Sequence, residues 1–472
     1  MAVEAVHGHE GEVTGLSTSM RYSSGRSRAA TRLLGIEGVA VVEVEEDPGG
    51  RRLARLVTDD EGAAACPTCG VVSTSVKGHA VTHPRDVPYG EDAVVLEWTK
   101  TRWRCRESSC PRGSFTESVP AIPARSRLTC RLRSACGAGI AESFRCVQSG
   151  GDFYGVSWPI AHSAFVAHVQ EWLAAPPPPV SVLGIDEISR GKRRWARDPA
   201  TGRWVLVADR WLTGIVDAAG TAGLLAHVEG RTAASVAAWL TGQPQAWREA
   251  VTHVAIDLSA SYANAIRLAL PHAVVVADRF HLVRLANDML TEVRQHATRE
   301  LRGRRGRARD PEWANRRRLL TAHERLRPET FARMWNELLD ADEVGVEILH
   351  AYTVKERLRH LLDLAPTPGT SVPDRSVISH RLWRFFDQAA GCDIPEVHRL
   401  AETVETWWPA IEAGLTTGYS NARSEGYNRL GKHEGRNAFG FRNTRNQERR
   451  IRWACTRQHR RETAIICHAM PG

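Results

Sequence analysis

Hydrophobic and polar residues alternate over much of residues 33–104, a pattern typical of β-strands with one buried face. The predicted strands cover residues 38–44, 52–57, 93–98 and 101–104, with a turn at residues 47–50 between the first two. The alternation predicts a small β domain over residues 32–118. The preceding residues, 1–31, are polar and rich in Gly and Ser, and we expect them to be disordered.

Helical periodicity replaces this alternation over residues 119–175. One helix is predicted near residues 128–140 and another over residues 156–173, with an apolar stripe made by Val156, Ile160, Phe165, Val169 and Leu173. Short helices with a Gly-containing connection indicate a helix-turn-helix DNA-binding domain, although an ordinary helical packing unit has the same pattern. Four consecutive prolines, residues 176–179, then mark a domain boundary, because proline cannot continue a helix.

Strands and helices alternate along residues 180–282. The predicted strands are 180–185, 203–209, 212–217, 251–256 and 273–277, the predicted helices are 233–241 and 261–268, and the second and third strands are expected to pair as a β meander. Residues 283–416 are charged, have helical periodicity and form a predicted all-helical insertion. Residues 417–455 then return to the α/β core, and residues 456–472 form a basic tail. The sequence therefore predicts a multidomain α/β protein.

Length and charge agree with this division and point to a nucleic acid. At 472 residues the chain is too long for one compact domain. Its net charge is +9, and the excess is uneven: residues 294–318 hold ten Arg against three acids, and residues 442–461 hold eight against one. Arg favours bidentate contacts with phosphate, so we interpret both segments as a nucleic-acid track, although solvated helix faces have the same composition.

Neither a membrane span nor a secretion signal is expected. No run of about 18 apolar residues occurs, and the N-terminus lacks a basic-then-apolar pattern. Ten cysteines without such a signal indicate thiols or metal ligands in a reducing compartment rather than disulfides. We therefore expect a cytoplasmic protein.

Four of the cysteines form two pairs with the spacing of zinc knuckles. The pairs are Cys66-x2-Cys69 and Cys105-x4-Cys110. Two thiolate pairs of this kind can bind one structural Zn²⁺ in tetrahedral geometry. His79 and His83 lie between the pairs and could replace a ligand, and the alternative is four buried cysteines that bind no metal.

Three acids lie where a phosphoryl-transfer site would need them. Asp186 and Asp257 each follow a predicted strand, and Glu425 lies in a polar segment with helical spacing. Mg²⁺ (or Mn²⁺) prefers carboxylate oxygens, and two ions about 3.5–4 Å apart can clamp the attacking and leaving oxygens of a phosphodiester. A lone aspartate after a strand is more often a turn or helix cap, so the predicted two-metal site rests on the set of three.

A polar stripe with helical spacing surrounds the third acid. Its members are Asn421, Glu425, Asn428, Lys432 and Arg436, which place a carboxylate, two amides and two cations on one helix face. A solvated helix face has the same pattern. In a metal-dependent site, Glu425 would hold the second ion while Asn428 and Lys432 contact the DNA backbone.

Read in order, several short segments resemble the ISL3-type bacterial insertion-sequence transposases. They are Gly184-Ile185-Asp186-Glu187, Asp257-Leu258-Ser259, Leu270-Pro271-His272-Ala273, Asp278-Arg279-Phe280-His281, and Ser420-Asn421 with Glu425-Gly426-Tyr427-Asn428. The upstream segments Cys66-Pro67-Thr68-Cys69, Trp103-Arg104-Cys105 and Cys110-Pro111 resemble that family's N-terminal zinc domain. The resemblance covers nearly the whole chain, and it implies a DDE catalytic core of ribonuclease-H-like fold, interrupted by the helical insertion.

The resemblance also implies an activity, DNA transposition. A metal-activated water would cleave the transposon end, and the freed 3′-OH would then attack target DNA. Asp186, Asp257 and Glu425 would be catalytic, while Asp278 and His281 would be accessory, since related DDE families carry a Cys- or Asp-x-x-His signature here. The partners implied are DNA and further copies of the chain in a homo-oligomer on that DNA, at the nucleoid. No nucleotide cofactor is expected, because a Walker A motif is absent.

The zinc domain and the helix-turn-helix would recognise the terminal inverted repeats of the element. The basic residues predicted to contact DNA are Arg102 and Arg104 beside the zinc ligands, and Arg436, Arg442 and Arg445 beyond Glu425. These contacts would position the DNA rather than take part in the chemistry.

Two other functions and one residue assignment stay open at this point. A nuclease or resolvase of the same fold would lack strand transfer, and a DNA-binding regulator would have no use for the three acids. Asp257 and Asp278 both follow apolar strands, and either could be the second acid. We favour Asp257, because its strand should lie beside the first strand, whereas Asp278 begins a helix and would cap it.

Overall fold

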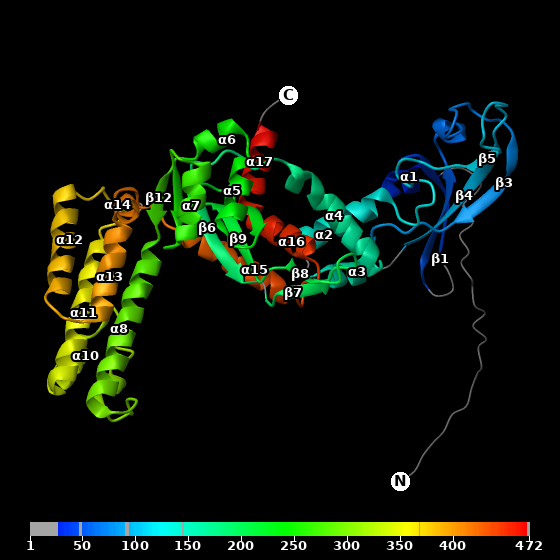
Figure 1. The fold of residues 1–472 in the computed structure, drawn as a ribbon. Coiled ribbons are helices and arrows are strands. Elements are labelled where there is room, and N and C mark those ends of the chain that lie inside the picture. The colour runs from blue at the N-terminus through cyan, green and yellow to red at the C-terminus, as the bar shows by residue number, and fades with distance from the viewer. Residues whose placement is uncertain are drawn as a thin grey trace, which may run out of the picture. The chain divides into compact units, whose positions relative to one another are not determined.

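The computed structural model describes residues 27–46, 50–89, 94–143, 146–189, 191–367 and 369–469, apart from the side chains of residues 208 and 464–469. The chain forms two compact units, Met1–Glu171 and Trp172–Gly472, whose elements are labelled in Figure 1. Residues 1–26, most of the segment that is predicted to be disordered, lie outside the described residues.

A five-stranded sheet forms the first part of the N-terminal unit. Its strands are β1 (Val39–Glu46), β2 (Arg52–Thr58), β3 (Val76–Thr82), β4 (Val94–Arg104) and β5 (Ser114–Thr116), in the order β1-β2-β4-β3 with β5 paired to β4. The pairing is antiparallel except between β2 and β4. Leu56, Leu96 and Trp98 are fully buried in its core.

This β domain differs from the predicted one in four places, of which the first is β5, a short strand that is absent from the predicted set. The two predicted strands at 93–98 and 101–104 are one strand, β4, because Thr99 and Lys100 between them pair with β3. β3 is absent from the predicted strands, since its alternate residues are exposed and it contains Gly78. Residues 28–31 belong to a helix, α1 (Arg28–Leu34), which Ser27 caps and Leu34 anchors in the core.

Three helices follow among the described residues of this unit and its boundary. They are α2 (Cys130–Glu142), α3 (Val147–Phe153) and α4 (Trp158–Ala174). The predicted helices at 128–140 and 156–173 correspond to α2 and α4. Gly137 lets α2 approach α4 closely, because a Cβ at this position would lie 2.5 Å from the carbonyl oxygen of Ala164. Whether these helices act as a DNA-binding helix-turn-helix stays a prediction.

A second five-stranded sheet lies in the C-terminal unit. Its strands are β6 (Val182–Ser189), β9 (Trp211–Asp217), β10 (Leu224–Glu229), β11 (His253–Ile256) and β12 (Val274–Ala277), in the order β10-β9-β6-β11-β12. β10, β9 and β6 pair antiparallel, whereas β6, β11 and β12 are parallel. The parallel strands bring their carboxyl ends to one edge of the sheet.

Helices cover both faces of this sheet (Figure 1). On one face lie α5 (Ala233–Thr241), α6 (Gln245–Ala250) and α7 (Ala260–Ala269), which bury Leu183 and Ile185 of β6. On the other face lie α15 (Ala422–Asn437) and α16 (Thr444–Cys455), which pack on β9 and β10. Successive strand residues point to opposite faces, so Gly184 and Asp186 lie on the face that α15 covers.

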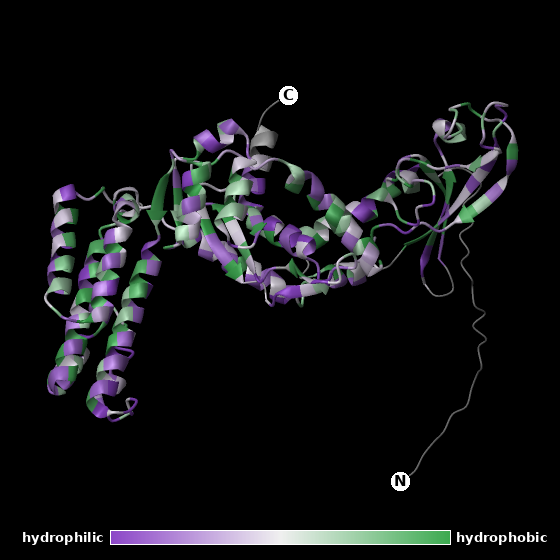
Figure 2. Ribbon diagram, in the orientation of Figure 1, coloured by the Kyte–Doolittle hydropathy of each residue, from purple (hydrophilic) through white to green (hydrophobic). Residues whose placement is uncertain are grey.

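Helices are the regular elements of the described residues between β12 and α15. They are α8 (Arg279–Arg302), α9 (Pro311–Ala314), η2 (His323–Arg325), α10 (Pro328–Leu339), α11 (Asp342–Leu362), α12 (Arg375–Ala390), α13 (Pro395–Thr406) and α14 (Trp408–Thr417). Hydrophobic and hydrophilic residues alternate along them in Figure 2. Their apolar sides share one core, in which Leu282, Leu358 and Phe385 are fully buried.

A hairpin leaves the second sheet between β6 and β9. It consists of β7 (Arg194–Arg197) and β8 (Trp204–Ala208), which pair with each other. The predicted meander of residues 203–209 with 212–217 is therefore wrong. β9 is buried on both faces between β6 and β10, whereas β8 is exposed. β10 itself is absent from the predicted strands.

The described chain ends in a helix, α17 (Arg457–Ala469), where the sequence predicts a basic tail. Every helix within the described residues is too short or too polar to span a bilayer.

Candidate active site and zinc site

Three aspartates lie next to one another at the carboxyl ends of the parallel strands. Ile256 of β11 pairs with Ile185 of β6 on one side and with Ala277 of β12 on the other. The residue that follows each of these three is an aspartate: Asp186, Asp257 and Asp278. This register confirms the prediction that the strand before Asp257 lies beside the strand that carries Asp186.

Asp186 lies within β6 rather than at its end, since the strand continues to Ser189. Its side chain is buried. Oδ2 accepts a hydrogen bond from Asn428 Nδ2 at 2.6 Å, and Oδ1 accepts one from the backbone N–H of Glu187 at 2.7 Å. Burial, and next the negative charge of Asp257, raise the pKa of Asp186 to about 7. A cation beside this carboxyl would therefore bind at a position where negative charge is already crowded.

His281 of α8 bridges the other two aspartates. Its Nε2 lies 3.0 Å from Asp257 Oδ2, and its Nδ1 lies 3.0 Å from Asp278 Oδ2. The hydrogen bond to Asp278 raises the pKa of His281. Burial lowers this pKa, and the negative charge of Asp257 raises it further. Burial raises the pKa of Asp257, and the positive charge of His281 partly offsets this effect. The imidazole thus fixes the position of the Asp257 carboxylate.

Asp278 has a different role from the predicted helix cap. It is fully buried at the start of α8, but its side chain makes no capping hydrogen bond to that helix. Instead its carboxylate accepts hydrogen bonds from His281 and, at 3.4 Å, from the backbone N–H of Asn421. The imidazole of His281, in the first turn of α8, takes the place of the backbone N–H groups that a helix cap would bind.

Asn421, at the start of α15, connects this helix to the acids. It is fully buried, and its Nδ2 donates to the backbone oxygen of Ile185 at 3.0 Å and to Asp257 Oδ1 at 3.3 Å. Gly184 permits the approach, because a Cβ there would lie 2.5 Å from Ser424 Oγ and 2.8 Å from Asn421 Oδ1. Asn421 belongs to the predicted polar stripe, but the spacing of that stripe does not predict that Asn421 contacts β6. The signal in the sequence is Gly184, because a glycine inside an apolar strand often marks a close approach of another segment.

Glu425 lies one turn further along α15 and is half-exposed. Its Oε2 lies 3.6 Å from Arg429, and its negative charge contributes to the raised pKa of Asp186. Asn428 of the same helix reaches Asp186 directly. The remaining members of the predicted stripe, Lys432 and Arg436, are exposed.

The predicted catalytic acids share one edge of the sheet, but their oxygens do not gather at one point. Within the described part of the chain, the acids and histidine that place ligand atoms within 4.8 Å of one another here are Asp257, Asp278 and His281. Asp186 and Glu425 lie outside that group. Like charges repel, and each acid has an amide or cationic partner of its own, Asn428 for Asp186 and Arg429 for Glu425.

A cavity of about 440 Å³ opens beside Asp257. Glu187, Tyr262 and His281 are among its lining residues. Glu187 points to the face opposite Asp186 and forms an ion pair with Arg231 at 3.0 Å. Of the three aspartates, Asp257 is the one that lines this cavity.

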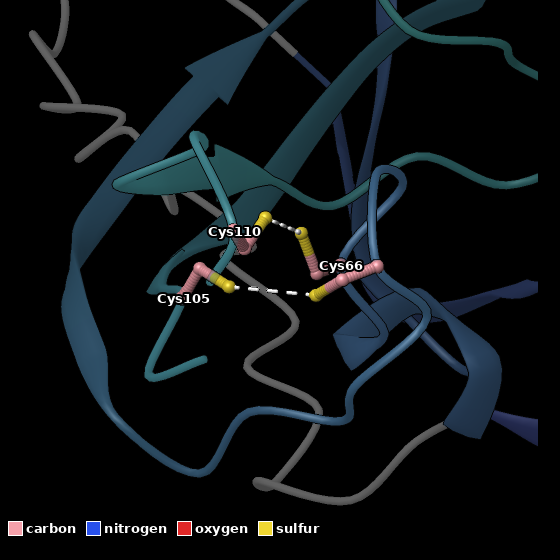
Figure 3. Close-up of side chains that lie close together, drawn as sticks. Cys66, Cys105 and Cys110 are labelled. Carbon is pink, nitrogen blue, oxygen red and sulfur yellow. Dashed lines mark hydrogen bonds between the residues drawn. The ribbon is translucent and has the colours of Figure 1, made fainter. Parts of the chain in front are cut away.

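The four predicted zinc ligands converge in the N-terminal unit. Cys66 and Cys69 precede β3, and Cys105 and Cys110 follow β4. Because β3 and β4 pair antiparallel, the end of β4 lies beside the start of β3, and the two knuckles meet (Figure 3). The Sγ atoms of Cys66 and Cys110 are 3.9 Å apart, those of Cys69 and Cys105 are 3.7 Å apart, and all four lie within 4.8 Å of one another. Tetrahedral Zn–S bonds of about 2.3 Å would separate the sulfurs by roughly 3.8 Å.

Within the first knuckle, the surroundings of Cys66 favour a thiolate. Burial raises the pKa of the Cys66 thiol, but hydrogen bonds from the backbone N–H groups of Cys69 and Thr68 outweigh burial and lower this pKa to about 6. His79 and His83, the alternative ligands, are outside the cysteine group, and His83 Nε2 lies 3.6 Å from Glu97. The donor set is therefore four cysteines, which fits zinc.

The arginines that are predicted to bind DNA lie on the surface in both units. Arg102 and Arg104 are exposed on β4 and, two residues apart, share one face of the strand. Arg436, Arg442 and Arg445 are exposed on α15, α16 and the loop between them.

Known proteins resemble both regions of the chain. A transposase family model, the ISL3-type DDE transposase domain, matches residues 183–451, and the zinc finger of transposases IS204, IS1001, IS1096 and IS1165 matches residues 62–110. The transposase of insertion sequence IS1001 from Bordetella parapertussis is 25% identical over 408 residues, covering 86% of this chain and 92% of the relative. The transposase of IS1557 from Mycobacterium tuberculosis is 29% identical over 211 residues, 41% of this chain and 45% of the relative.

A solved structure, the Drosophila P element transposase strand transfer complex, is 10% identical and covers 69% of this chain and 91% of that chain, with a TM-score of 0.37. The family model and the insertion-sequence relatives define the class, that of the DDE transposases, enzymes that cleave DNA and transfer strands by means of divalent metal ions. The chain belongs to the ISL3 family of these transposases, since the family model matches more than half of its length.

Proposed function

We propose that Asp186, Asp257 and Glu425 are the catalytic acids of a ribonuclease-H-like core that performs the cleavage and strand transfer. The observation that carries the proposal is the in-register pairing of β6 with β11, which sets Asp186 beside Asp257 under α15, the helix that carries Glu425. If the strands of this sheet are numbered along the chain without the β7–β8 hairpin, their spatial order across the sheet is 3-2-1-4-5. This order, with the first three strands antiparallel and the last two parallel to the first, supports the ribonuclease-H-like core that the sequence resemblance implies.

The donor set at this edge supports the binding of Mg²⁺ or Mn²⁺, and we propose two such ions. The available side-chain atoms are carboxylate and amide oxygens, which hard cations prefer. The raised pKa values of Asp186 and Asp257 reflect buried negative charge that a divalent cation would neutralise. When bound, two such ions supply an activated nucleophile and stabilise the leaving oxygen of the phosphodiester.

The neighbouring residues hold these acids in place. Asn428 donates to Asp186 and orients its second oxygen, while His281, held by Asp278, orients Asp257. Lys432, exposed one turn beyond Asn428, is available to the DNA backbone. No Ser, Cys or His nucleophile is needed beside the acids, because the attacking group in this proposal is a water or a DNA 3′-OH.

The remaining regions serve binding in this proposal. The cysteine cluster holds one Zn²⁺, and the zinc domain with α2–α4 recognises the terminal inverted repeats through residues such as Arg102 and Arg104. The helices between Arg279 and Thr417 are an insertion into the catalytic core. The protein assembles as a homo-oligomer on its DNA, in the cytoplasm at the nucleoid, as two element ends must be joined to one target.

The test is cleavage of a duplex that carries the inverted repeat found beside the gene. Asp186→Asn, Asp257→Asn and Glu425→Gln should each abolish Mg²⁺-dependent cleavage while binding to the duplex stays within about twofold, because the acids touch metal rather than bases. Glu402→Gln, an exposed acid on α13, is the matched control and should cleave normally.

Two outcomes would change the proposal. Substantial cleavage by Glu425→Gln would remove α15 from the active site. Cleavage by the wild-type protein without joining to target DNA would make the protein a nuclease of the same fold, the competing interpretation of the sequence.

A further inference from the structure

The β7–β8 hairpin exposes large apolar side chains on both of its faces. Trp195 is 54% exposed and Trp204 is 68% exposed, and the neighbouring Val205, Leu206 and Val207 are exposed as well. A monomeric protein rarely leaves so many apolar groups together in water unless they bind a partner. The chemistry of the remaining hairpin residues identifies that partner.

Charge around the tryptophans favours a polyanion. Residues 191–210 contain six basic residues, Lys192, Arg193, Arg194, Arg197, Arg203 and Arg210, against two acids, Asp198 and Asp209. Of the two acids, Asp198 is occupied in the turn, where it accepts hydrogen bonds from Ala200 and Thr201. Tryptophan and arginine are also common at protein interfaces, but a net excess of four positive charges around exposed aromatic rings is typical of surfaces that bind single-stranded nucleic acid.

Both tryptophans lie on the same face of the hairpin. The register pairs Trp195 with Leu206 and Arg197 with Trp204. Residues opposite each other in a β-ladder point to the same side, and so do alternate residues of one strand. Trp195, Arg197 and Trp204 therefore form one continuous surface of two indole rings and a guanidinium.

This surface extends from the edge of the sheet that holds the acids. Ser189, at the end of β6, pairs with Trp211, at the start of β9, so the hairpin begins shortly after Asp186. Arg194 donates to the backbone oxygen of Arg442 at 2.9 Å, which joins the hairpin to the loop between α15 and α16. A third aromatic ring, Phe439, projects from that loop with 92% of its surface exposed.

Phe439 is held in a conformation that a bulky residue rarely adopts. Its φ is +55°, in the left-handed region that disfavours side chains with a Cβ. Such backbone strain persists where the side chain has a use in its exposed position. The loop thus presents an aromatic ring next to the basic residues that follow it.

We propose that the β7–β8 hairpin, together with Phe439, binds unstacked nucleobases of DNA at the cleavage site. Trp195 and Trp204 stack on the bases, which requires no particular sequence, and the arginines around them contact the phosphates. This proposal rests on the proposed function, because it requires a DNA strand to pass the edge of the sheet that carries the acids.

The test compares two single strands of equal length that differ only in their bases. One is fluorescein-labelled oligothymidine and the other is the same backbone with abasic sites, each titrated with the full-length protein in EDTA. The wild-type protein should prefer oligothymidine. Trp195→Ala and Trp204→Ala should each weaken oligothymidine binding about fivefold or more, while Trp204→Phe should keep most of it. All of them should bind the abasic strand as the wild type does.

The matched control is Trp383→Ala, which removes another exposed tryptophan, on α12, and should not change either affinity. Equal weakening for both strands would mean that the hairpin senses charge alone and would overturn the proposal. The proposal would also be overturned if Trp195→Ala and Trp204→Ala bound oligothymidine as the wild type does but had a lower molecular mass than the wild type in sedimentation. The hairpin would then be a contact between copies of the chain.

The catalytic assignment is tested separately in the same samples. Asp257→Asn should keep the preference for oligothymidine over the abasic strand and cleave no DNA. If Asp257→Asn cleaves normally while the base preference depends on Trp204, the assignment of the acids is wrong and the hairpin proposal stands.

Discussion

The zinc site and the acidic site differ in what holds their residues together. The four cysteines come from two short knuckles at the ends of one strand pair, and their sulfurs already lie at zinc-binding separations. The acids come from β6, β11 and α15, and each has its own partner among His281, Asn428 and Arg429. Thiols can pack together because they are neutral until they ionise, whereas carboxylates repel one another. The fold alone thus brings the four cysteines to zinc-binding distances, whereas the acids also need bound cations to come together.

The largest predicted effect concerns the zinc site. Cys66→Ser combined with Cys105→Ser should lose all zinc and unfold the ribbon around residues 62–118, because structural zinc supplies roughly 10–16 kcal/mol to folding. Metal analysis of the purified chain and limited proteolysis would measure both results. Cys130→Ser, an exposed cysteine outside the cluster, is the control and should retain one zinc per chain. Full zinc content in the double variant would show that the four cysteines are not the ligands.

The next effect separates the two aspartates beside His281. Asp278→Asn should reduce cleavage by about 10- to 100-fold without abolishing it, because Asp278 acts through His281, as residues behind metal ligands do. Its pH profile should also move, since a neutral partner lowers the pKa of His281. Asp387→Asn, exposed on α12, should leave both unchanged. An Asp278→Asn variant as inactive as Asp257→Asn would favour Asp278 as the second catalytic acid.

A smaller effect follows from the raised pKa of Asp186. Because its folded-state pKa of about 7 exceeds the usual unfolded value near 3.8, its contribution to stability is complete at low pH and is lost as the pH rises from about 4 through 7. At about 1.4 kcal/mol for each pKa unit, the loss should be on the order of 4 kcal/mol. Thermal unfolding in EDTA should therefore show that Asp186→Asn is less stabilised by acid than the wild type and is more stable at pH 8. An equal pH dependence of stability in the wild type and in Asp186→Asn would contradict the shift.

The smallest predicted effect concerns the arginines on the surface. Arg442→Ala or Arg445→Ala should weaken DNA binding alike for different sequences and lower the slope of log Kd against log salt by about one for each phosphate that the variant no longer neutralises. Titrations at several salt concentrations would measure this. An unchanged slope would mean that these arginines are solvated rather than bound to phosphate.

Much of this fold could be predicted from the sequence, and the exceptions have physical causes. Strong apolar runs identify β6, β11 and β12, and helix α5 begins and ends at the predicted residues. Knuckle spacing identifies all four cysteines of the cluster because that site is local. The strands β3 and β10 and the partner of β8 could not be predicted, since one sequence pattern does not specify which strands pair.

The acidic site shows the same limit at the level of single residues. Asp186 and Asp257 could be predicted as neighbours from the ends of parallel strands. The hydrogen bonds of Asp278 to His281 and of Asn421 to Asp257 could not, because they depend on how α8 and α15 pack on the sheet edge. Helix capping, a local rule, predicted the wrong partner for Asp278.

The most direct test of the acidic site exchanges the metal preference of each acid. A thiolate binds Mn²⁺ better than Mg²⁺, because softer ligands suit softer cations. Asp257→Cys should therefore be inactive in Mg²⁺ and recover cleavage in Mn²⁺. Asp278→Cys should show no such rescue, since we propose that Asp278 positions His281 rather than binding a metal. Rescue of Asp278→Cys by Mn²⁺, with Asp257→Cys inactive in both metals, would contradict the assignment of Asp186, Asp257 and Glu425 as the catalytic acids.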